Sequence, residues 1–230
     1  MPDPSQFTGD KKVGQNSLFS APEKKFINWA APKVPARIKS HHLTYSTIVW
    51  SLGIILFGYL AQDDLNWLWG ASAMILLQWL TDVLDGAVGR RRNKGLVKWG
   101  YYMDHFLDYI FLCSVLIGYS FFLNDYLDNS LFFILAVFGG FMVNSYLSFA
   151  ATGEFRITYL KIGPTEMRLV FIIVNTLLVI FGKTYMARAL PYVLAFSAAG
   201  LWLVVYRTQK MIWKKDMEAK NPNAIESSGR

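Results

Sequence analysis

The sequence is poor in cysteine and in charge, and both shortages narrow the protein classes open to it. Cys113 is the single cysteine among 230 residues, which excludes an intrachain disulfide and a thiol cluster for metal or redox chemistry. Charged residues make up only 17% of the chain, whereas 53% of its residues are hydrophobic. A soluble domain of this length could not bury so much apolar surface while solvating so few charges. The composition therefore excludes a disordered chain and a typical cytosolic enzyme, and indicates a membrane protein.

Six apolar segments, each near the roughly 20 residues needed to cross a bilayer, predict an all-α polytopic membrane protein. Backbone polar groups in hydrocarbon must be satisfied internally, so such runs form helices rather than open strands. The expected spans are 43–61, 67–89, 101–123, 130–151, 169–182 with its flanks, and 189–208. We therefore expect three parts: a cytoplasmic N-terminal segment (1–42), a six-helix transmembrane domain (43–210) and a polar cytoplasmic tail (211–230).

The basic residues lie on one side of these predicted spans. Twenty-one of the 23 lysines and arginines fall before the first span, between spans two and three, between spans four and five, or at the end of the last span and beyond. Lys183 and Arg188, in the loop between spans five and six, are the two others. The positive-inside rule places both termini in the cytoplasm. Topology thus explains the net charge of +7, and we expect no nucleic-acid partner.

Residues 23–31 combine apolar side chains with lysines and suit a short juxtamembrane helix. Phe26 and Trp29 stand beside Lys24 and Lys25 in this stretch. Such a helix could lie on an anionic membrane surface. A solvated basic leader is the alternative interpretation.

Four aspartates stand near the cytoplasmic ends of spans two and three: Asp82, Asp85, Asp104 and Asp108. An ionised carboxylate at the centre of a membrane span costs about 3 kcal/mol, so such residues mark functional sites. Each pair is three or four residues apart and shares a helix face. The short basic loop between the two spans favours neighbouring helices. The spacing therefore predicts four carboxylates at one depth.

Four carboxylates without a counter-cation would repel one another, and most would take up protons. A hard divalent cation would keep them charged, and oxygen ligands with only His105 nearby favour Mg²⁺ or Mn²⁺ over Zn²⁺. Mg²⁺ often shares its coordination shell with phosphate, which predicts a phosphorylated ligand. Gly86 and Gly100 would let a ligand approach the backbone, and Arg90 could bind phosphate. The structural alternatives are an ion-pair network with the neighbouring arginines and close helix packing at the glycines.

Read together, these residues resemble the signature of the CDP-alcohol phosphotransferase family of integral membrane enzymes. The pattern is Asp82-x2-Asp85-Gly86-x3-Arg90, followed by Gly100-x3-Asp104-x3-Asp108. The six-span topology with cytoplasmic termini agrees with that family. Two positions depart from it: Gly89 replaces the usual alanine, and nine residues separate Arg90 from Gly100 where the family usually has eight.

The resemblance implies an enzyme of phospholipid synthesis in which an acceptor hydroxyl attacks the β-phosphorus of a CDP-linked alcohol and CMP is released. Asp82, Asp85, Asp104 and Asp108 would hold two Mg²⁺ or Mn²⁺ ions, and Asp108 would also act as general base. The residues implied in binding the cytidine diphosphate are Asp82, Gly86, Arg90 and Gly100. The predicted topology places the aspartates, and with them the active site, at the cytoplasmic face, in the inner membrane if the chain is bacterial. Because homodimers are common in the family, a homodimer is a further expectation.

The acceptor is left open by the sequence. Three basic residues lie between spans four and five: Arg156, Lys161 and Arg168. They predict a pocket for a polar or phosphorylated acceptor, and the alternative interpretation is that they are positive-inside anchors. The donor we expect is CDP-diacylglycerol. The alternative is CDP-choline or CDP-ethanolamine with diacylglycerol as acceptor, a branch to which Gly163 to Glu166 and the Asp104-His105 pair are mildly similar.

Two other function classes use membrane carboxylates. Intramembrane prenyltransferases bind Mg²⁺-pyrophosphate through aspartates on two well-separated segments, whereas all four aspartates lie in one helical hairpin here. A divalent-cation transporter would use the aspartates as an ion site, but transporters tend to place such residues near the bilayer midplane. Their position near the ends of the spans favours the enzyme.

Overall fold

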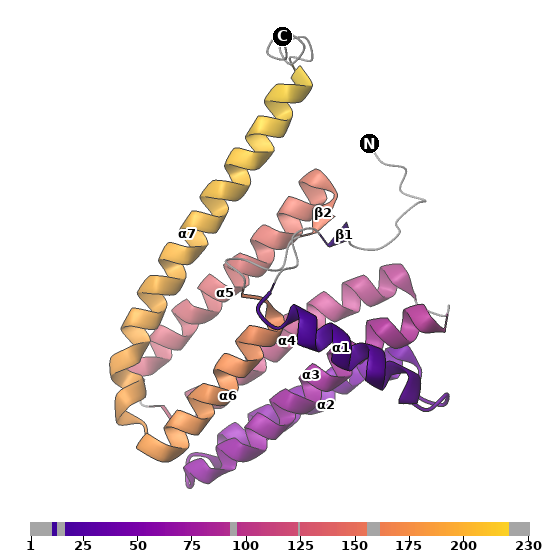
Figure 1. Ribbon diagram of the computed structural model, residues 1–230. Helices are drawn as coiled ribbons and strands as arrows, with labels where there is room; N and C mark the ends of the chain where they lie inside the picture. Colours follow the sequence, from indigo (N-terminus) through magenta and orange to yellow (C-terminus); the bar gives the residue numbers. More distant parts are fainter. Residues whose placement is uncertain (1–10, 13–16, 93–95, 124, 156–161, 221–230) are drawn as a thin grey trace.

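The computed structural model describes residues 11–12, 17–92, 96–123, 125–155 and 162–220, and helices dominate it (Figure 1). The helices are α1 (Ser20–Ala30), α2 (Ser40–Leu60), α3 (Leu68–Arg91), α4 (Val97–Ser120), α5 (Asp125–Thr152), α6 (Pro164–Phe181) and α7 (Thr184–Lys220). Two short 3-10 helices, η2 (Ala31–Lys33) and η3 (Leu65–Trp67), follow α1 and precede α3. Two-residue strands β1 (Lys11–Lys12) and β2 (Glu154–Phe155) pair in parallel. The all-α class is confirmed.

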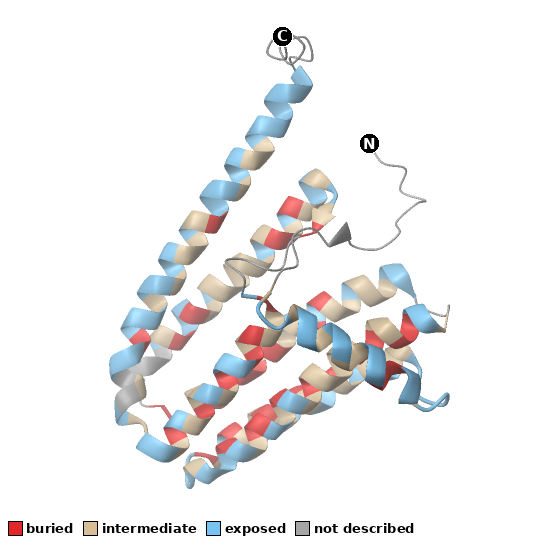
Figure 2. Ribbon diagram, viewed as in Figure 1, coloured by how far each residue is buried: buried red, intermediate tan, exposed pale blue. Residues whose placement is uncertain are grey.

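Helices α2, α3 and α4 pack together, α6 lies against α3, and α5 pairs with α7 beside this group (Figure 1). The main core lies among α2, α3, α4 and α6, where Ile54, Ile75, Val115 and Leu178 are almost fully buried. The outer helix α7 is mostly exposed (Figure 2). Large apolar side chains exposed along its length, such as that of Trp202, are expected where a helix faces lipid.

Five helices in the described part of the chain are long and apolar enough to cross a membrane: α2, α3, α5, α6 and α7. They agree with a polytopic membrane protein. Six spans were predicted, and α4 is not among the five because Asp104, His105 and Asp108 lower its hydropathy. α4 packs along α2 as a 24-residue helix. That it spans the bilayer stays a prediction.

Both ends of the described chain lie at the same end of the bundle. The backbone N–H of Phe19, just before α1, donates to Glu166 Oε1 at the start of α6 (2.9 Å). Near the other end, Lys215 Nζ contacts Glu154 Oε1, just after α5 (3.0 Å). This arrangement agrees with termini on one side of a membrane, while the cytoplasmic assignment stays a prediction. α7 continues helically to Lys220, ten residues beyond the predicted end of the transmembrane domain.

Two glycines allow α2 and α4 to approach closely. A Cβ atom built on Gly58 would lie 2.4 Å from Gly118 Cα, a distance no side chain can adopt without moving the helices apart. We expect Gly58→Ala to destabilise the protein by about 1–3 kcal/mol because of overpacking. Gly139→Ala is the matched control, since its added Cβ would only meet Tyr109 at 4.0 Å. Thermal unfolding in detergent measures both, and equal melting temperatures would contradict the close α2–α4 contact.

Candidate functional site

A polar cavity of about 1070 Å³ lies where α3 ends and where α4 and α6 begin. α1 contributes to one side of it, with Lys24 and Asn28 among its lining residues. The predicted site residues in the cavity wall are Asp82, Asp85, Gly86, Arg90, Gly100, Asp104 and Arg168. The cavity thus collects residues from α1, α3, α4 and α6 at one end of the bundle.

The spacing of the four aspartates explains why they meet. Asp82 and Asp85 lie on one face near the end of α3, and Asp104 and Asp108 on one face near the start of α4. Asp104 lies close enough to the three other carboxylates to interact electrostatically with each. Asp108 is not part of the cavity lining, but Arg168, which is, contacts it directly. The structure therefore brings the four predicted carboxylates together.

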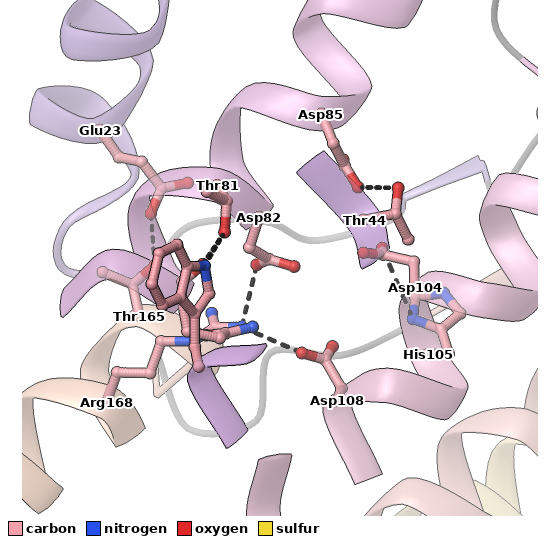
Figure 3. Close-up of polar contacts among 12 residues, drawn as sticks. Glu23, Thr44, Thr81, Asp82, Asp85, Asp104, His105, Asp108, Thr165 and Arg168 are labelled. Carbon is pink, nitrogen blue, oxygen red and sulfur yellow. Dashed lines mark hydrogen bonds and ion pairs between the residues drawn. The ribbon is translucent and has the colours of Figure 1, made fainter. Parts of the chain in front are cut away.

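Each carboxylate has a polar neighbour (Figure 3). The Thr44 hydroxyl donates to Asp85 Oδ2 (2.8 Å), and the Ser40 hydroxyl donates to the Asp85 carbonyl oxygen (3.0 Å). Asp104 Oδ2 lies 4.0 Å from His105 Nδ1. Thus α2 supports the α3 side of the site, a contact that the sequence pattern did not indicate.

Arg168 of α6 joins the two helices that carry the aspartates. Its Nη2 lies 2.9 Å from Asp82 Oδ2 and 3.0 Å from Asp108 Oδ1. Its Nε donates to Gln78 Oε1 (2.6 Å), and the guanidinium carbon lies 5.5 Å from the centre of the Phe111 ring. Arg168 is only 3% exposed, so these contacts enclose it. One buried cation therefore holds a carboxylate from α3 and one from α4.

The donor chemistry of this site fits a hard divalent cation. Even with Arg168 neutralising part of it, four carboxylates carry a surplus of negative charge, and their oxygens are the ligands that Mg²⁺ and Mn²⁺ prefer. As the side chains stand, no three His, Cys, Asp or Glu residues in the described chain converge as a metal-binding group. Asp82 and Asp108 turn instead to Arg168, and Asp85 to Thr44. The carboxylate oxygens therefore support the proposal of a metal site, but the side-chain arrangement does not define how a metal ion would be coordinated.

Comparison with known proteins decides the family. The model of the CDP-alcohol phosphatidyltransferase family matches residues 40–206. The chain belongs to this family. A search of curated proteins found no match to the chain. The match confirms the family predicted from the aspartate pattern, and with it a membrane transferase whose substrates are a CDP-alcohol donor and a hydroxyl acceptor.

The phosphatidyltransferase match begins at Ser40, the first residue of α2, so α1 lies outside it. α1 is nevertheless fixed against the matched region. Glu166 accepts from the backbone N–H of Phe19 and, through its other oxygen, from that of Gly163 (2.8 Å). The Thr165 hydroxyl donates to Glu23, and Phe26 stacks on Trp79 of α3 with ring centres 5.4 Å apart. The predicted helix at 23–31 thus exists as Ser20–Ala30 and forms part of the cavity, while its contact with a membrane surface stays a prediction.

The two glycines of the phosphatidyltransferase signature and the arginines at the end of α3 have distinct surroundings. A Cβ atom on Gly86 would lie 3.1 Å from a guanidinium nitrogen of Arg90, so the glycine leaves room for that side chain. A Cβ atom on Gly100 would meet no atom within 4 Å, which agrees with open space in the cavity. Arg92, one of the basic residues between predicted spans two and three, donates to the carbonyl oxygens of Ile38 and Val34 (2.6 and 2.7 Å). It therefore also ties the chain before α2 to the end of α3.

Of the three residues predicted to bind the acceptor, the structure describes one. Arg156 and Lys161 lie outside the described residues. Arg168 lines the cavity, but its Nε and Nη2 are engaged by Gln78 and by the aspartates. Sequence reasoning missed Gln78, although a polar residue four positions before Asp82 within an apolar run was a usable signal.

Proposed function

We propose that the protein transfers a phosphatidyl group from CDP-diacylglycerol to an acceptor hydroxyl in a Mg²⁺- or Mn²⁺-dependent reaction of phospholipid synthesis. The observation that carries this proposal is that Asp82, Asp85 and Asp104 line a polar cavity at one end of a bundle of apolar helices, and that Arg168 in the cavity wall joins Asp108 to them. A diphosphate could bind there while the acyl chains of its lipid remain in the bilayer. We place this end of the bundle at the cytoplasmic face, in the inner membrane if the chain is bacterial.

In the proposed reaction, the acceptor oxygen forms a bond to the β-phosphorus of the donor. The phosphoanhydride bond to the α-phosphate breaks, and CMP leaves with the bonding electrons. Asp108 takes the proton of the acceptor hydroxyl as general base. Asp82, Asp85, Asp104 and Asp108 would hold two divalent ions, which would neutralise charge on the phosphoryl oxygens.

The remaining signature residues would bind the cytidine diphosphate. Gly86 and Gly100 leave room at the cavity wall, and Arg90 offers a guanidinium for phosphate. Arg156, Lys161 and Arg168 would attract the acceptor. A homodimer is the assembly we propose, because the family implies it.

Offering the purified protein CDP-diacylglycerol or CDP-choline tests which substrate carries the lipid. We expect CMP release from CDP-diacylglycerol with water-soluble hydroxyl acceptors, and none from CDP-choline with diacylglycerol. The reverse result would assign the choline or ethanolamine branch. Uptake of Mn²⁺ into proteoliposomes without nucleotide, with no CMP release from either donor, would favour a transporter.

A further inference from the structure

Gln78 is a buried polar residue that no motif of the family accounts for. It lies on α3 four residues before Asp82, so the two side chains share a helix face. Its side chain is fully buried (0% exposed), and its Oε1 accepts the hydrogen bond from Arg168 Nε. Its Nε2 has no hydrogen-bond partner among the described residues, and leaving such a group buried costs stability. The bond from Arg168 is thus the polar contact that the described residues give to the Gln78 side chain.

This contact determines where the arginine points. The guanidinium is planar and rigid, so fixing Nε also fixes the direction of Nη2. Nη2 then lies between Asp82 and Asp108, within 3.0 Å of both. Because α6 supplies Arg168 while α3 and α4 supply the two aspartates, the contact joins three helices at the site.

We propose that Gln78 and Arg168 form a positioning pair that sets the spacing and orientation of Asp82 and Asp108. Gln78 orients the guanidinium, and the guanidinium keeps the first and last carboxylates of the signature at a fixed distance and orientation. This inference rests on the proposed function, in which both aspartates bind divalent ions and Asp108 is the base. Neither member of the pair needs to contact the reacting atoms.

Gln78→Met tests the pair because it keeps side-chain volume and net charge but removes the acceptor oxygen. With Arg168 no longer aimed by α3, we expect Mn²⁺ to bind about 10-fold more weakly to the full-length protein, as for other changes behind metal ligands. Electron paramagnetic resonance titration with Mn²⁺ alone measures this directly. We also expect kcat to fall about 10-fold with an unchanged KM for the CDP donor.

Asn175→Leu is the matched control for general damage to the bundle. Asn175 lies on α6 seven residues after Arg168, is 1% exposed, and donates from Nδ2 to Ser72 of α3 (3.0 Å). It also accepts from the Tyr119 hydroxyl (2.8 Å). It is therefore another buried α3–α6 polar contact outside the cavity lining. We expect its loss to lower the melting temperature while Mn²⁺ affinity and kcat stay at wild-type values.

Arg168→Lys provides a second variant if Gln78→Met fails to fold. It keeps the charge but loses the planar fork, and should weaken Mn²⁺ binding to a similar extent. The positioning role would be overturned if a variant that folds kept the wild-type Mn²⁺ affinity and kcat. Tighter Mn²⁺ binding by such a variant would overturn it as well. A wild-type protein that neither binds Mn²⁺ nor releases CMP would instead refute the proposed function.

Discussion

Asp108→Asn should lower the rate of CMP release by about 10²- to 10⁴-fold, the contribution expected of a general base. The amide keeps the size of the side chain and can still accept a hydrogen bond from Arg168, but it cannot take the proton of the acceptor hydroxyl. Single-turnover kinetics with saturating donor and acceptor would isolate this step from product release.

The control for this substitution is Asp63→Asn, between α2 and α3, at the opposite end of α3 from the signature aspartates. Asp63 is exposed and lies outside the cavity lining, so its variant should turn over at the wild-type rate. Full turnover by Asp108→Asn would remove Asp108 as the base. The cavity wall offers Asp104 and His105 as the next residues to test.

Removing divalent cations should abolish the reaction. Without them, nothing would keep the four carboxylates ionised, and nothing would neutralise charge on the phosphoryl oxygens. We expect EDTA to bring CMP release to the background rate, and added Mg²⁺ or Mn²⁺ to restore it. Zn²⁺ should restore it poorly because the ligands are oxygens.

Asp104→Asn links this loss to the site. Asp104 interacts electrostatically with all three other carboxylates, so its neutralisation should raise the Mg²⁺ concentration for half-maximal rate at least 10-fold. A rate that survives EDTA, or an unchanged Mg²⁺ dependence in this variant, would contradict the metal proposal.

Hydropathy predicted where the long helices lie, because lipid-facing and core-facing residues are both apolar. It was less informative where function places charge: α4 carries Asp104 and Asp108 and falls outside the set of clearly apolar spans. It does not address the end of α7, where polar residues that favour helices extend the helix to Lys220, beyond the predicted span 189–208.

The sequence at the start of α6 has the residue types typical of a helix N-terminus. Gly163, Pro164 and Glu166 stand at the N-cap, N1 and N3 positions, and Glu166 bonds back to the Gly163 N–H. Asn175, a polar residue within the predicted fifth span, forms hydrogen bonds with Ser72 and Tyr119. A polar residue inside a span is thus compatible with a helix when neighbouring helices supply its partners.

The residues of the site differ in how far they could be predicted from the sequence. The aspartates could be predicted to meet because helical spacing and a short loop are local properties. The partners of those aspartates could not, because Thr44 lies 41 residues from Asp85, and Arg168 lies 60 residues from Asp108. Such contacts depend on how helices pack, which no short motif encodes.

The most direct test of the central claim is the stoichiometry of the reaction in lipid nanodiscs that contain CDP-diacylglycerol. The nanodiscs are supplied with Mg²⁺ and, in separate reactions, with glycerol phosphate, inositol or serine as the hydroxyl acceptor. One of these acceptors should yield one molecule of new phospholipid for each CMP released. CMP release should stop when that acceptor is omitted. Formation of no phospholipid with any acceptor, or CMP release independent of the acceptor, would contradict the assignment of this cavity as a phosphatidyl-transfer site.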